Sequence, residues 1–179
     1  MEPFLGPGFH PAEVVLRTGE EHSEARFLAD RMLGKLARYL RILGYDVAYP
    51  APCSDALLIA QARRENRVLL TRDRGIMGAL ASYSGHPEVV EIRSPSVLQQ
   101  IDQMVSEGWI DRARSPRCPL CNQALKEMPY WEARHLTPPF THATQLSFLH
   151  CGPCNLILWE GSHWDLFRHR LGRLLGGAR

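Results

Sequence analysis

Short apolar runs alternate, from Arg26 to Glu107, with segments whose apolar residues recur at helical spacing. The apolar runs predict strands at 27–30, 45–49, 68–70 and 89–92. The periodic segments predict helices at 31–43, 54–66, 76–81 and 96–107. Because strands and helices alternate, we expect an α/β fold in which helices flank both faces of a mostly parallel sheet. In such a sheet the functional side chains gather at the carboxyl ends of the strands.

The first predicted helix has the clearest apolar face. The residues of that face are Leu33, Leu36, Ala37, Leu40 and Leu43. Gly44 follows directly and is expected to end the helix at the C′ position, where a left-handed backbone favours glycine. Ser54 is expected to be the N-cap of the second helix.

Three changes of pattern predict the domain organisation. Residues 1–24 have no periodicity and are expected to be a tail or the remnant of an upstream segment. Residues 25–112 hold the strand and helix alternation, and 112–116 form a charged segment that ends in proline and is expected to be a linker. Residues 117–179 are rich in Cys, His, Trp and Pro, as in a small metal-stapled unit, and end in a basic helix at about 165–175.

The composition is that of an ordinary globular protein. The chain has 179 residues, of which 45% are apolar, so it can bury one good core or two small ones. Neither a signal peptide nor a membrane span is expected, because no apolar stretch has the required length and flanks. A cytoplasmic protein without membrane partners is therefore expected. The net charge of +2 is a weak argument for nucleic-acid binding.

Four of the five cysteines fall into two CxxC pairs, and Cys53 is left over. In a reducing compartment this pattern favours a metal over disulfides, because each pair points two thiolates at one ion. The expected ligands of a structural zinc ion are Cys118, Cys121, Cys151 and Cys154. Asn122 and Asn155 each follow the second cysteine of a pair, and asparagine tolerates the left-handed backbone that such turns need. The alternative interpretation is two unrelated pairs of reduced thiols.

Asp30, Asp55 and Asp73 are the candidate catalytic residues. Each also precedes a helix or turn, and for any one of them alone a capping role is the better interpretation. Together they are expected at one edge of the sheet, since Asp30 and Asp73 follow adjacent strands and Asp55 opens the helix between. Three close carboxylates repel one another unless a divalent cation lies among them. Magnesium or manganese suits such an all-oxygen site, and hydrolysis of a phosphodiester bond is the natural reaction.

Basic residues accompany these aspartates. Arg31, Lys35 and Arg38 share one helical face and could follow a phosphate backbone away from the metal, whereas the alternative is a solvated helix face. Arg72 and Arg74 flank Asp73 and add positive charge where an RNA would enter.

Aromatic residues are concentrated in the cysteine-rich unit. Tyr130 and Trp131 lie between the two CxxC pairs, and Trp159 and Trp164 follow them. Exposed rings there could stack unpaired bases. The preferred interpretation is that they form the small core that this unit needs.

Several motifs stand in order along the chain: FLADRMLGKLARYLRILGYDV from Phe27, SDALLIAQARRENRVLLTRDRG from Ser54, the two CxxC pairs, and WEGSHW from Trp159. Together they resemble, over about 26–168, the PIN-like RNase domain with a C-terminal zinc ribbon that ends Mut-seven-type exonucleases and also occurs in free-standing prokaryotic proteins. This resemblance implies a PIN-like fold and metal-dependent cleavage of RNA, with Asp30, Asp55 and Asp73 at the acidic positions of the family.

The chain departs from this family at Gly75, where the family often has a fourth acidic residue, and the departure puts a second metal ion in doubt. Free-standing relatives can also carry a ubiquitin-like domain before the nuclease, and residues 1–24 are too short for one. A missing ubiquitin-like segment or a larger nuclease is therefore a candidate partner, beside the RNA itself, single-stranded or structured.

Three functions remain open at this point. The first is a metal-dependent ribonuclease, which the three aspartates and the basic helix favour. The second is an RNA-binding module that has lost catalysis, which Gly75 favours. The third is a protein-interaction domain that docks through its zinc ribbon.

Overall fold

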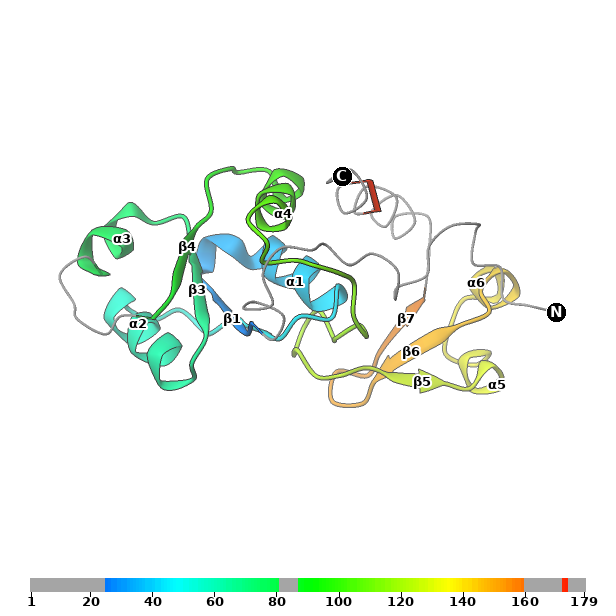
Figure 1. The fold of residues 1–179 in the computed structure, drawn as a ribbon. Coiled ribbons are helices and arrows are strands. Elements are labelled where there is room, and N and C mark those ends of the chain that lie inside the picture. The colour runs from blue at the N-terminus through cyan, green and yellow to red at the C-terminus, as the bar shows by residue number, and fades with distance from the viewer. Residues whose placement is uncertain (1–24, 81–86, 160–171, 174–179) are drawn as a thin grey trace.

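The computed structural model describes residues 25–80, 87–159 and 172–173, and its first part is a four-stranded parallel sheet. The strands are β1 (Phe27–Ala29), β2 (Val47–Ala48), β3 (Val68–Thr71) and β4 (Val89–Glu91), in the order β2-β1-β3-β4. The helices are η2 (Arg31–Leu33), α1 (Gly34–Ile42), α2 (Asp55–Arg64), α3 (Arg74–Leu80) and α4 (Val97–Ser106). The expected α/β fold with a parallel sheet flanked by helices is confirmed (Figure 1).

Each face of the sheet is covered by its own pair of helices (Figure 1). Phe27 and Ala29 point to the face that packs against α1 and α4. Leu28, between them, points to the opposite face, where Leu58 of α2 and Ile76 of α3 cover it. Because both faces are buried, the strands are continuous apolar runs rather than alternating ones.

The apolar face predicted for the first helix is confirmed, since all five of its residues are buried. Three details differ from the expectation. The first turn, Arg31–Leu33, is a 3-10 helix capped by Asp30, so that α1 begins only at Gly34. The predicted strand 45–49 pairs only over Val47–Ala48. Ser54 stands at the N-cap of α2 with extended backbone, but its side chain makes no capping hydrogen bond.

Residues 111–117, which include the segment expected to be a linker, pack against the end of α1. The Arg114 amide donates to the Leu43 carbonyl (2.9 Å) and the Arg117 amide to the Arg41 carbonyl (2.8 Å). The last carbonyls of a helix lack partners within the helix, and this segment supplies them. The Tyr45 hydroxyl donates to Asp111 (2.8 Å), and burial together with that carboxylate raises the pKa of Tyr45 to about 12. The connection is therefore held at both ends.

The second part of the structure, 117–159, is called the ribbon below. Its antiparallel sheet has the order β5-β6-β7, from β5 (Lys126–Met128), β6 (Phe148–Cys151) and β7 (Leu156–Trp159). Two short helices that the sequence pattern did not predict, α5 (Tyr130–Ala133) and α6 (Pro139–Thr144), lie between β5 and β6. Met128, Ala133 and Phe148 form its small core.

Two expectations fall on residues outside this description: the tail at 1–24 and, apart from 172–173, the basic helix at 165–175. None of the helices in the described ranges is both long and apolar enough to cross a membrane.

We predict that Gly44→Ala destabilises the protein by at least about 1–3 kcal/mol. Gly44 has a φ of +92°, and a Cβ there would lie 2.6 Å from the Arg114 Cβ and 2.7 Å from the Ser115 carbonyl oxygen. Urea unfolding of the purified variant measures the change. Gly78→Ala, where a Cβ meets nothing within 4 Å, is the matched control and should be neutral or stabilising. Equal stabilities of the two variants would contradict the prediction.

Candidate active site and metal centre

The three candidate aspartates line one pocket at the carboxyl ends of β1 and β3. Asp30 directly follows β1, Asp73 lies two residues beyond the end of β3, and Asp55 is the first residue of α2. The pocket has a volume of about 290 Å³. Its other lining residues are mostly apolar, with one charged side chain among them: Arg31, Met32, Pro50, Ala51, Cys53, Leu58 and Ile76. Three aspartates from separate parts of the chain thus line one cavity, together with apolar residues such as Leu58 and Ile76.

Asp30 is the buried member of this set, at 4% exposure. One carboxylate oxygen accepts the Met32 amide (2.7 Å), which makes Asp30 the cap of η2. The other accepts the Thr71 hydroxyl and the Arg72 amide (3.0 Å). These hydrogen bonds fix the carboxylate and join the end of β1 to the end of β3.

Thr71 links two of the aspartates, and the sequence pattern did not single it out. It is fully buried, donates its hydroxyl to Asp30, and accepts the Asp73 amide on the same oxygen (2.9 Å). Its signal in the sequence is a hydroxyl at the end of an otherwise apolar strand, immediately before Arg72 and Asp73. Thr71 therefore sets the path of the chain into the second half of the site.

Asp73 and Asp55 are exposed, unlike Asp30. A carboxylate oxygen of Asp73 accepts the Gly75 amide at the start of α3 (2.7 Å). A Cβ at Gly75 would lie 3.0 Å from that oxygen, so the glycine leaves room for the carboxylate to turn back over the helix. Asp55 lies in the first turn of α2, where its charge suits the helix dipole.

The aspartates share a pocket but are not packed as tightly as metal ligands. Among the described residues, the four cysteines are the single group of three or more His, Cys, Asp or Glu whose ligand atoms all lie within 4.8 Å of one another. Asp30 and Asp73 each accept the amide two residues further on, and both also line the pocket. The binding of one ion by all three carboxylates stays a prediction.

Of the predicted basic residues, one lines this pocket. Arg31, Lys35, Arg38 and Arg74 are exposed, and Arg31 also lines the pocket. Arg72 is half-buried, and its backbone amide is the one that Asp30 accepts. The pocket is thus acidic inside, with Arg31 at its wall and an exposed basic face on α1.

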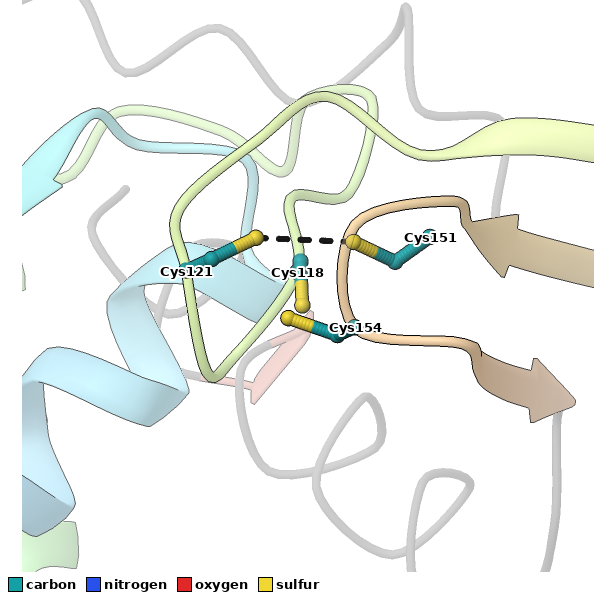
Figure 2. A group of neighbouring side chains, drawn as sticks. All are labelled: Cys118, Cys121, Cys151 and Cys154. Carbon is teal, nitrogen blue, oxygen red and sulfur yellow. Dashed lines mark hydrogen bonds between the residues drawn. The ribbon is translucent and has the colours of Figure 1, made fainter.

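The four cysteines of the two CxxC pairs form a compact cluster (Figure 2). Their sulfurs lie within 4.8 Å of one another, and those of Cys121 and Cys151 are 3.4 Å apart. The Gln123 backbone amide lowers the pKa of Cys121 to about 7, whereas the neighbouring thiols raise the pKa of Cys154. Four sulfurs from two tight turns fit a tetrahedral metal such as zinc.

The left-handed backbone expected in both cysteine turns is confirmed, with φ of 68° at Asn122 and 48° at Asn155. Asn122 does more than turn the chain. Its side-chain oxygen accepts the Val47 amide (3.2 Å), and its side-chain nitrogen donates to Asp46 (2.7 Å). Asp46 in turn pairs with Arg67 at 2.8 Å. The first cysteine turn is therefore docked on β2.

Arg41 of α1 also holds the first cysteine turn, and no pattern in the sequence predicted this contact. Its side chain is 5% exposed, and it donates to the carbonyls of Val47, Pro119 and Leu120, each at 2.9 Å. Burial lowers the pKa of Arg41, and the negative charges of Cys118 and Cys121 oppose that shift.

The preferred interpretation of the aromatic residues as the ribbon core is wrong for two of them. Trp131 is 69% exposed and Trp159 is 40% exposed. Tyr130 is partly consistent with it, because its ring packs on His142 (4.0 Å between centroids) and on Phe148. Trp164 lies outside the described residues. The small core of the ribbon instead consists of Met128, Ala133 and Phe148, with Ile157 packed against it.

Comparison with known proteins gives one match. No curated protein and no solved structure matches the chain. The family model described as Mut7-C RNAse domain matches residues 25–171, which include the aspartate pocket and the four cysteines. The chain belongs to the Mut7-C RNAse domain family.

Proposed function

We propose that this protein is a metal-dependent ribonuclease that hydrolyses phosphodiester bonds of RNA at the pocket lined by Asp30, Asp55 and Asp73. The observation that carries the proposal is that these three aspartates, from separate parts of the chain, line one cavity of an RNase-family chain. In this proposal residues 25–112 form a PIN-like nuclease domain, and 117–179 form a zinc ribbon with a C-terminal helix.

The donor set of the pocket fits a hard divalent cation. Carboxylate oxygens are the ligands that magnesium and manganese prefer, and a bound ion would orient a water, lower its pKa and stabilise charge on the phosphate. Asp30 is held rigid by its hydrogen bonds to Met32, Thr71 and Arg72. Asp55 and Asp73 are exposed, and an oxygen of Asp73 accepts the Gly75 amide. A buried carboxylate that is held in place by its own hydrogen bonds is the kind of preorganised ligand that a metal site requires.

The basic face of α1 is the proposed path of the RNA. Arg31 lies at the pocket, and Lys35 and Arg38 continue along the same face, all three exposed. Phosphate contacts of this kind position a strand without reading its bases.

A second candidate function is RNA binding without cleavage. Gly75 favours it, since this position lacks the fourth acidic side chain and places its amide on Asp73 instead. Cleavage of a labelled RNA with magnesium or manganese distinguishes the two, because the binding module would retain RNA and leave it intact.

Asp73→Asn should lower the rate of cleavage at least about 100-fold, while RNA affinity stays similar or rises. The substitution removes a metal-binding charge and also reduces repulsion of phosphate. Single-turnover cleavage and a binding titration measure the two effects. Glu88→Gln removes an exposed carboxylate outside the pocket and should leave both unchanged. Full activity of Asp73→Asn with magnesium would overturn the proposed mechanism.

Lys35→Glu and Arg38→Glu should each weaken RNA binding and flatten its dependence on salt. Every phosphate contact that is lost removes about 0.7 from the log–log slope for a single strand. Titrations at several salt concentrations measure the slope. Arg63→Glu, an exposed arginine near the far end of α2, is the charge-matched control. If all three variants lose the same RNA affinity and the same salt slope, the basic face of α1 has no special role in RNA binding.

Purified protein should contain one tightly bound zinc ion per chain, because four thiolates from two tight turns close a tetrahedral site. Cys121→Ser should lose that zinc and unfold the ribbon, while the α/β domain keeps its own core. Elemental analysis gives the zinc content, and circular dichroism follows the fold. Cys53→Ser, which removes the cysteine outside the cluster, should keep its zinc. Far less than one zinc per wild-type chain would refute this.

A further inference from the structure

Arg41 is a buried cation whose hydrogen bonds go to carbonyls. Within the described ranges, none of the ion pairs closer than 4 Å involves Arg41. Its partners are instead Val47 of the edge strand and Pro119 and Leu120 of the first cysteine turn. A buried charge is costly unless an opposite charge lies near it. Asp46 already supplies one negative charge near Arg41, and a guanidinium buried this far would gain from a further anion.

The cysteine cluster can supply that anion. Pro119 and Leu120 stand between Cys118 and Cys121, so Arg41 holds the loop that carries two of the four sulfurs. Four thiolates around one zinc ion leave a local charge of roughly −2. Cys118 and Cys151 are buried, whereas Cys121 is exposed and Cys154 half-buried. Water would therefore screen the charge of Cys118 less than that of Cys121.

The same cysteine turn reaches β2 through Asn122. This residue follows Cys121 directly, and its left-handed backbone sets the direction of its side chain toward Val47 and Asp46. Asn155 has the equivalent place and backbone in the second turn but is exposed. The contact of the ribbon with β2 thus depends on the shape of the first turn, which the metal bonds of Cys118 and Cys121 would fix.

We propose that Arg41 is the counter-charge of the metal-loaded cysteine cluster, and that metal loading holds the ribbon on β2 through Arg41 and Asn122. Without metal, Arg41 would keep the charge of Asp46 but lose that of the cluster. The first turn would also lose its fixed shape, so that the ribbon separates from β2. This inference depends on the proposed zinc site and not on the proposed cleavage of RNA.

The first test measures zinc release from the full-length protein to a chromogenic chelator. Arg41→Met should weaken zinc binding about 10–100-fold, the usual effect of removing a group that supports the metal ligands. Arg41→Lys keeps the positive charge but loses the planar guanidinium that donates several hydrogen bonds at once. Its zinc affinity should lie between those of Arg41→Met and wild type. Arg38→Met, an exposed residue one turn earlier, is the control and should match wild type. Equal zinc affinity in Arg41→Met and wild type would overturn the counter-charge role.

The second test follows docking directly and needs no substitution at Arg41. The Val47 amide donates to Asn122, so its hydrogen exchange reports the opening of this contact. When the chelator removes zinc, the exchange rate of this amide should rise at least about 10-fold. The Leu69 and Leu70 amides of β3 should stay protected. Unchanged protection of Val47 after zinc removal would overturn the coupling.

A matched pair of variants separates docking from metal binding. Asn122→Gly keeps a residue that accepts positive φ but removes the side chain, so it should expose the Val47 amide while zinc remains bound. Asn155→Gly makes the same change in the second turn and should leave Val47 protected. If Asn122→Gly also leaves Val47 protected, Asn122 does not dock the ribbon, and the proposal fails.

Discussion

The pairing of β1 with β3 is the constraint on which the pocket depends. The register sets Ala29 opposite Leu70, and the Asp30 amide donates to the Leu70 carbonyl at 3.0 Å. With this register, the residue after β1 and the last residue of β3 are neighbours, which brings Asp30 against Thr71. Slippage by one residue would turn the buried Leu28 and Leu69 to the wrong face. The cores on the two faces of the sheet therefore also fix the geometry of the acidic site.

The elements that sequence pattern predicted are those whose partners lie nearby in the chain or follow a simple period. The helical face of Leu33 to Leu43 and the left-handed Gly44 are local features, and both are found. The neighbouring positions of Asp30 and Asp73 follow from the rule that parallel strands end at one edge. That the same two residues both accept backbone amides and line the pocket could not be predicted from the sequence pattern, because it depends on the hydrogen bonds of the folded chain.

The features that escaped prediction depend on contacts distant in sequence. Arg41 stands 78 residues before Pro119, and only the folded chain shows that its guanidinium is buried against that carbonyl. Asn122 gave a correct backbone prediction, but its side chain meets Val47, 75 residues away. Helices α5 and α6 are four and six residues long, too short for periodicity to show.

The docking of the ribbon has a consequence for association between molecules. β2 lies at the edge of the sheet, and such an edge is normally open to strand addition by another chain. Here the amide of Val47 is taken by Asn122 and its carbonyl by Arg41. A foreign strand would have to displace two side chains, one of them charged, before it could pair. At Val47, the backbone groups through which another chain would add a strand are thus already occupied, one by the ribbon and one by α1.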